Sequence, residues 1–144
     1  MFIGEYEHTI DAKNRLAMPS RFRRALGATV VVTRGLDNCL FVYPMKEWRT
    51  LAEKLGSLSI GDAATRSFVR LMLSGASDST PDKQGRIVIP AYLREYATLD
   101  KQVTIAGLYN RLEIWDTAAW RRYKENAERH TDTVAQRLGD MGVY

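Results

Sequence analysis

Short apolar runs alternate with polar turns along this 144-residue chain. Residues 2–10 alternate in period two, as a half-buried strand does. A turn at 11–15 and a short strand at 16–18 follow, and the three segments together predict a β-hairpin. Pro19 is placed to open a helix that stops at Gly27, a residue type suited to the position just after a helix.

Two more strands and a longer helix complete the first half. The strands are predicted at 29–33 and 40–43, and the helix carries an apolar stripe at helical spacing. A linking helix is predicted over 62–73, with three residues facing inward. The stripe consists of Trp48, Leu51, Ala52 and Leu55, and the inward residues of the linking helix are Phe68, Leu71 and Met72.

The same pattern then recurs, which is the sequence signature of a duplicated structural unit. At an offset of 71, Asp11 matches Asp82 and Arg15 matches Arg86, and after one inserted residue the turn at 35–38 matches 107–110. The second half thus predicts strands at 102–106 and 112–115 and a helix capped by Asp116, with a stripe of Trp120, Tyr123 and Ala127.

The repeat predicts an α+β protein built from tandem β-β-α-β-β-α units. The expected division is a first repeat at 1–58, a linking helix at 59–73, a second repeat at 74–128 and a tail or helix extension at 129–144. Because four short strands cannot bury both of their faces, we expect the two copies to share one core.

Composition excludes few classes of protein. The net charge is +4, and 45% of residues are hydrophobic. The basic residues are concentrated, since five of them and no acid lie between Lys13 and Arg24. A single cysteine, Cys39, excludes an internal disulfide, and neither a signal peptide nor a membrane span is recognisable, so we expect a cytoplasmic protein.

Catalytic and metal-binding signatures are not found in the sequence. A zinc site needs three or four clustered ligands, whereas His8, His130 and Cys39 are far apart along the chain. No nucleophile elbow, Walker loop or dinucleotide fingerprint occurs. We therefore expect neither an enzyme nor a bound cofactor or metal.

The duplicated Asp-x-x-x-Arg loop is the candidate for function. Asn14 and Gly85 occupy matching positions, and both residue types tolerate a positive φ. The loop is open to two interpretations: a purely structural clasp, in which the aspartate pins the arginine, or a ribbon tip that presents the arginine to the major groove of DNA. Arginine is the usual bidentate reader of guanine O6 and N7 there.

Several motifs resemble the MraZ family of bacterial transcriptional regulators, which contain two AbrB-like (SpoVT-AbrB) units. They are the opening Met-Phe-x-Gly-Glu-Tyr-x-His, both Asp-x-x-x-Arg loops, and Met18-Pro19-Ser20-Arg21-Phe22-Arg23. The resemblance implies a swapped-hairpin β-barrel with flanking helices and association into rings. It also implies a nucleoid-associated repressor that binds double-stranded DNA at promoter direct repeats, upstream of the division and cell-wall gene cluster that includes its own gene.

The two loops and the helix behind the first provide the predicted site. Arg15 and Arg86 should read bases, with Lys13, Lys83 and Asn14 assisting, while Asp11 and Asp82 brace the loops. The predicted phosphate contacts are Arg21, Arg23 and Arg24. The alternative is an oligomeric interaction protein that binds a protein partner through the same loops, and a steep salt dependence of binding would favour DNA.

Overall fold

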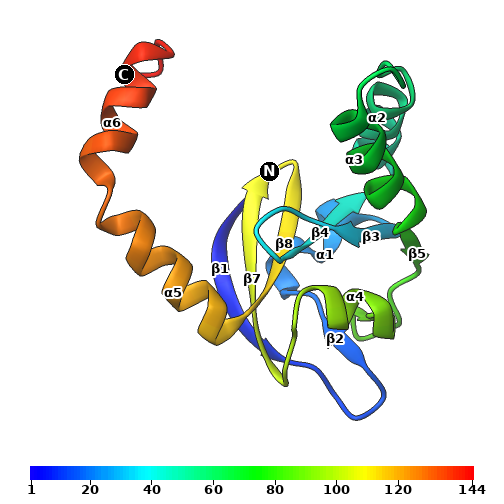
Figure 1. The fold of residues 1–144 in the computed structure, drawn as a ribbon. Coiled ribbons are helices and arrows are strands. Elements are labelled where there is room, and N and C mark those ends of the chain that lie inside the picture. The colour runs from blue at the N-terminus through cyan, green and yellow to red at the C-terminus, as the bar shows by residue number, and fades with distance from the viewer.

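The computed structural model describes residues 1–144 as a mixed α+β protein (Figure 1). The strands are β1 (Phe2–Thr9), β2 (Arg15–Ala17), β3 (Val30–Arg34), β4 (Leu40–Pro44), β5 (Ser77–Ser79), β6 (Arg86–Val88), β7 (Gln102–Tyr109) and β8 (Arg111–Asp116). The helices are α1 (Ser20–Leu26), α2 (Met45–Gly56), α3 (Ala63–Ser74), α4 (Ala91–Tyr96), α5 (Thr117–Glu128) and α6 (Thr131–Asp140).

Strands from the two halves of the chain are interleaved. One antiparallel sheet has the order β1-β7-β8-β4-β3-β5, and β2 pairs with β6 in a separate two-stranded ribbon. The first strand of each half therefore pairs with the other half. β1 lies against β7 from Phe2, opposite Tyr109, to Thr9, opposite Gln102, and β5 lies against β3.

Two sequence expectations about these strands need correction. The predicted hairpin over 2–18 is wrong, because the chain reverses at 11–15 but β1 pairs with β7 and β2 pairs with β6. The closed swapped-hairpin barrel is not confirmed, since the six-stranded sheet is open and ends at β1 and β5. Alternation along a strand fixes which side chains face inward, but it does not choose the partner strand.

The main core lies between the ribbon, the short helices α1 and α4, and one face of the large sheet. It contains residues of both halves, as expected for copies that share one core. Leu16 of β2 and Ile87 of β6 are directly opposite each other and are 0% and 1% exposed. The predicted inward residues of α1 and α4 are also buried: Phe22, Leu26, Leu93 and Ala97.

A second apolar cluster occupies the other face of the sheet, beneath α2 and α3. It includes Cys39, which is buried just before β4. Met72 is buried on α3 as predicted, but Leu71 is wrong as an inward residue, since it is 49% exposed. Met72 and Phe68 are four positions apart and face the cluster together, which leaves Leu71 on the outer side of the helix.

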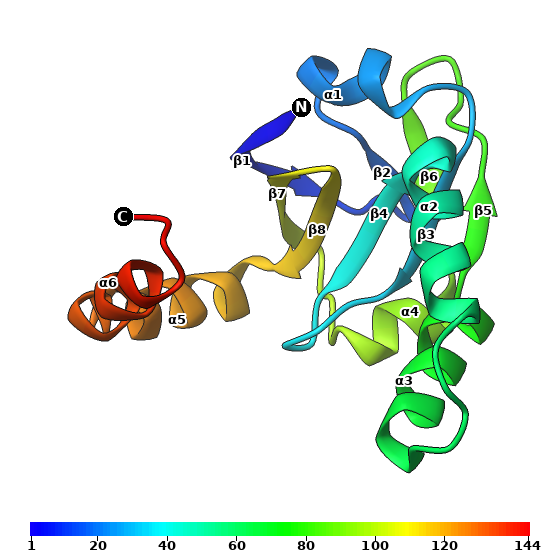
Figure 2. The ribbon, with the colours of Figure 1, turned by 90° about the horizontal axis from the view of Figure 1, so that it is seen from above.

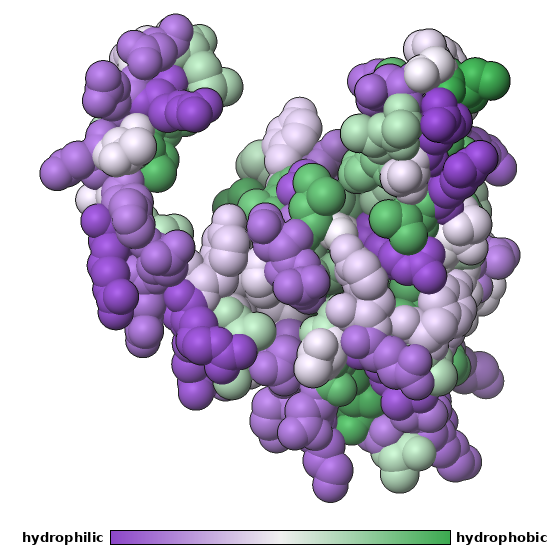
Figure 3. Space-filling model, in the orientation of Figure 1, coloured by the Kyte–Doolittle hydropathy of each residue, from purple (hydrophilic) through white to green (hydrophobic).

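The second half differs from the first at its C-terminal helix. Helices α5 and α6 extend away from the sheet as an arm (Figures 1 and 2), and the visible face of this arm is largely hydrophilic (Figure 3). The apolar stripe predicted for α5 holds only in part. The Tyr123 ring lies 4.9 Å from that of the buried Trp115, although Tyr123 is 44% exposed, and Ala127 is exposed. Residues 131–140 form a separate helix with no buried residue.

The turn predicted at 107–110 is displaced, since β7 continues through Tyr109 and the chain reverses at Asn110. Pairing with β1 accounts for this extension. At Gly107 the two strands approach so closely that an added Cβ would lie 2.6 Å from the backbone nitrogen of Ile3. No helix in the structure has the length and apolar character required to cross a membrane.

Truncation of one buried ribbon residue tests whether the ribbon is part of the core. We expect Ile87→Ala to lower the free energy of unfolding by about 2–5 kcal/mol, because it leaves a cavity beneath the ribbon. Val88→Ala is the matched control, since Val88 is 52% exposed on the opposite face and should cost less than about 0.5 kcal/mol. Urea unfolding measures both, and equal losses would contradict this packing.

Candidate nucleic-acid interface

The β2–β6 ribbon brings the two repeated loops to one surface. Arg15 lies opposite Val88, and Ala17 lies opposite Arg86. Since Leu16 and Ile87 point into the core, Arg15 and Arg86 share the outward face. They are diagonal neighbours on this face, a relation that separates the two residues by about 7–8 Å and their Cβ atoms by somewhat less.

The ribbon continues into both loops through their main chain. The Met18 amide donates to the carbonyl of Gly85 at 2.9 Å, and the Ile89 amide donates to the carbonyl of Asn14 at 3.0 Å. Each loop is thus attached to the strand that belongs to the other repeat. Asn14 and Gly85 have φ values of 62° and 73°, which confirms the positive φ predicted at both positions.

Asp11 closes the first loop through both carboxylate oxygens. Its Oδ1 accepts from the amides of Lys13 and Arg15 at 2.9 Å each, and its Oδ2 accepts from Arg15 Nε at 2.7 Å. The loop amides and the arginine side chain are therefore held by one carboxylate. This side chain is 33% exposed, so water still reaches it.

The second loop repeats this geometry. Asp82 Oδ1 accepts from the amides of Gln84 and Arg86 at 2.9 Å each, and Asp82 Oδ2 accepts from Arg86 Nε at 2.7 Å. Each arginine side chain is 28% exposed. In both loops the aspartate engages Nε alone, and the two terminal Nη groups make no hydrogen bond within the protein.

The lysines of the two loops are not equivalent. Lys13 follows Asp11 by two residues, whereas Lys83 follows Asp82 by one, and both side chains are exposed. The position equivalent to Lys13 in the second loop is Gln84. The two lysines therefore place their charges differently around two nearly identical loops.

The three arginines of α1 do not form one cluster. Arg23 donates from Nε to the carbonyl of Met18 at 3.0 Å, and Arg21 donates from Nη1 to the Tyr6 hydroxyl at 3.4 Å. Arg24 is exposed and makes no side-chain hydrogen bond or ion pair. Of the three, only Arg23 donates a hydrogen bond to the end of the ribbon.

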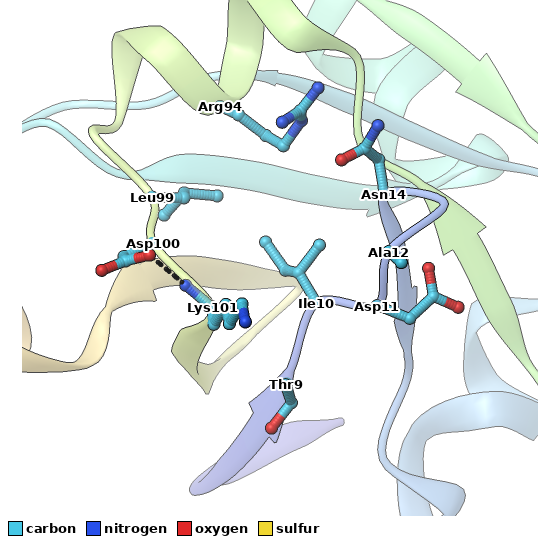
Figure 4. Close-up of a pocket in the computed structure, with 9 residues that line it drawn as sticks. All are labelled: Thr9, Ile10, Asp11, Ala12, Asn14, Arg94, Leu99, Asp100 and Lys101. Atoms are coloured by element: carbon cyan, nitrogen blue, oxygen red, sulfur yellow. Dashed lines mark hydrogen bonds between the residues drawn. The ribbon is translucent and has the colours of Figure 1, made fainter.

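Arg94 and Lys101 also flank the first loop, and sequence reasoning left them out of the site. With Asn14 and Asp11 they line a cleft of about 420 Å³ (Figure 4). Arg94 could have been found, because it matches Arg23 in the repeat. Lys101 carries no such signal: it reaches the loop because β1 pairs with β7, and its carbonyl accepts from the Ile10 amide.

A related cleft of about 360 Å³ flanks the second loop and is lined by Arg23, Lys83 and Gly85, among others. Basic side chains thus border the ribbon at both loops. Nowhere in the structure do three or more His, Cys, Asp or Glu side chains gather in a way that could hold a metal ion.

The hydrogen bonds to Asp11 and Asp82 predict a pH dependence. The hydrogen bond from the Arg15 amide is the main cause that lowers the pKa of the Asp11 carboxyl, and the Arg15 side chain and the Lys13 amide lower it further. The Arg86 amide, the Arg86 side chain and the Gln84 amide lower the pKa of the Asp82 carboxyl in the same way. A carboxyl whose pKa is lower in the folded state stabilises the fold above its unfolded pKa, and this stabilisation disappears as the pH falls through the folded pKa.

We therefore expect Asp11→Asn and Asp82→Asn to be less stable than the unmodified protein at pH 7. The difference should shrink once the pH falls below the ordinary aspartate pKa of 3.8. Thermal unfolding over this pH range measures it. A difference that stays constant from pH 7 to pH 2 would show that ionised carboxylates do not close the loops.

Comparison with known proteins matches this chain to one family along nearly its whole length. The family model of the MraZ protein, described as antitoxin-like, matches residues 1–71 and again 72–141. A Transcriptional regulator MraZ of Desulfitobacterium hafniense (strain DSM 10664 / DCB-2) is 50% identical over 143 residues, which cover 99% of this chain and 100% of the relative.

Further relatives have the same name. The Transcriptional regulator MraZ of Halothermothrix orenii is 50% identical over 143 residues, with the same coverage. The one from Carboxydothermus hydrogenoformans is 47% identical over 141 residues, covering 98% of this chain and 99% of the relative. The duplicated family match and these full-length relatives confirm the resemblance seen in the sequence, and the chain therefore belongs to the MraZ family.

Proposed function

We propose that this protein regulates transcription by sequence-specific DNA binding, and that it reads bases with Arg15 and Arg86. One observation supports this most strongly. Two aspartate-held arginines lie on the outward face of a single two-stranded ribbon, with the Nη groups of both free of protein partners. Relatives named transcriptional regulators over their full length support the regulatory role.

The geometry suits the major groove of B-DNA. A two-stranded ribbon fits a groove about 12 Å wide, and an arginine can donate two hydrogen bonds to O6 and N7 of guanine. Because Nε is held by the aspartate, the Nη edge is the part of the guanidinium left to face a base. The aspartates also restrict both side chains before binding, which lowers the entropy that binding costs.

The surrounding basic residues would contact the phosphates of the DNA backbone. Lys13 and Lys83 are exposed beside the reading arginines, and Asn14 lies at the first tip. Arg21 and Arg24 lie further along α1, where phosphate contacts would fix the position of the protein without reading sequence. With Lys13, Arg21 and Arg24, the first repeat would supply most of these contacts.

The family to which the chain belongs suggests the target and the assembly. The proposed operator is a set of direct repeats upstream of the division and cell-wall gene cluster, and binding would repress this cluster and the protein's own gene. The protein would act at the nucleoid, in the cytoplasm and without a cofactor. A ring of subunits would present several ribbons to successive repeats and gain avidity through effective concentration.

Removal of either reading arginine should relax sequence preference. We expect Arg15→Ala and Arg86→Ala each to lose about 1–3 kcal/mol of preference for the native duplex, roughly 5- to 150-fold in affinity. Fluorescence anisotropy measures binding to DNA from upstream of the protein's own gene and to a scrambled duplex. Arg122→Ala is the control, because it removes the same charge from exposed α5.

Unchanged preference in both arginine variants would contradict the base-reading role. Equal weak binding of the unmodified protein to both duplexes would contradict sequence-specific recognition altogether, and would favour a protein partner for the loops.

The loop lysines should behave differently from the arginines. If Lys13 and Lys83 contact phosphates, Lys13→Ala and Lys83→Ala should weaken binding to all duplexes by a similar factor. Each should also reduce the slope of log affinity against log salt by about 0.9. Titrations at several salt concentrations measure this slope, and a loss confined to the native duplex would instead assign the lysine to base reading.

A further inference from the structure

One arginine on each short helix is bound to the end of the ribbon. Arg23 of α1 donates from Nε to the carbonyl of Met18 at 3.0 Å, and Arg94 of α4 donates from Nε to the carbonyl of Ile89 at 3.1 Å. Each carbonyl precedes the proline at which the strand gives way to the helix. Both arginine side chains therefore turn back from their helices onto the ribbon.

Arg23 lies directly on the loop of the other repeat. A Cβ added to Gly85 would be 2.7 Å from Arg23 Cδ and closer still to its Nε. Gly85 is buried, although it belongs to a surface loop. The same contact is supported by the main chain, because Met18 accepts from Arg23 through its carbonyl and donates through its amide to the carbonyl of Gly85.

Arg94 has the equivalent relation to the first loop. Ile89 accepts from Arg94 and donates through its amide to the carbonyl of Asn14. Arg94 and Asn14 line the same cleft, and Figure 4 shows the Arg94 side chain reaching from α4 toward the Asn14 loop. Asn14 has a side chain where Gly85 has none, so the first loop cannot be covered as closely as the second.

We propose that Arg23 and Arg94 are positioning residues that act across the two repeats. Arg23 fixes the loop that carries Arg86, and Arg94 fixes the loop that carries Arg15. Gly85 and Asn14 each immediately precede the reading arginine and have a positive φ, so their backbone conformation sets the direction in which that arginine leaves the loop. The effect on DNA binding that follows from this inference rests on the proposed function.

Amide hydrogen exchange on the full-length protein without DNA tests the positioning directly. In Arg23→Ala we expect the amides of Gln84 and Arg86 to exchange about two- to tenfold faster, the factor that corresponds to one lost hydrogen bond. The amides of Lys13 and Arg15 should stay unchanged, and Arg94→Ala should give the reverse pattern. Unchanged exchange in β7 and β8 would show that each variant remains folded.

Two further variants separate positioning from charge. Arg24→Ala removes the same charge from the same helix but breaks no side-chain hydrogen bond or ion pair, so it should alter neither loop. Arg23→Met keeps an unbranched stem over Gly85 and removes the donor to the Met18 carbonyl, so it should loosen the same loop as Arg23→Ala. The proposal is overturned if Arg23→Ala speeds amide exchange only in residues 11–15, in both loops equally, or in neither loop.

DNA binding supplies the second readout. Arg23→Ala should reduce the preference for the native duplex over the scrambled one and leave the salt slope unchanged. A slope reduced by about 0.9, with equal loss on both duplexes, would make Arg23 a phosphate contact instead. If the unmodified protein shows no preference, the proposed function fails, but the exchange pattern still decides whether the two arginines position the loops.

Discussion

The pairing of β2 with β6 is the interaction on which the rest of the structure depends. Leu16 and Ile87 meet face to face beneath this ribbon and are almost completely buried. Because side chains alternate along a strand, burial of these two residues turns Arg15 and Arg86 outward on one surface. The ribbon also attaches each loop to the opposite repeat, through the carbonyls of Asn14 and Gly85. A single pairing thus joins the shared core to the candidate interface.

The order and type of most elements could be predicted from the sequence, because proline, glycine and apolar spacing are local signals. The matching of Asn14 with Gly85 even predicted a positive φ at both. Strand partners could not be predicted in this way, since alternation constrains faces and not neighbours. The stripe on α5 was predicted as a core face for a related reason. Its spacing is helical, but no second helix covers it as α3 covers α2.

The candidate site, too, could be predicted only in part from the sequence. The repeat identified Asp11, Arg15 and their counterparts without any structure, because the chemistry of each loop is contained within five consecutive residues. It could not show that two loops 71 positions apart form one surface, or that Arg23 bears on a loop outside its own repeat. Both facts follow from the pairing of β2 with β6, which the repeat in the sequence does not show.

Methylation protection on the proposed operator is the most direct test of base reading, because it reports access to guanine N7. Arg15 and Arg86 are diagonal neighbours on the ribbon. We therefore predict that the unmodified protein protects guanines a few base pairs apart, in the major groove of each DNA repeat. Arg15→Ala and Arg86→Ala should each expose a different guanine of the pair. Protection that is lost at the same guanine in both variants, or that occurs at no guanine, would contradict reading by two arginines on one surface.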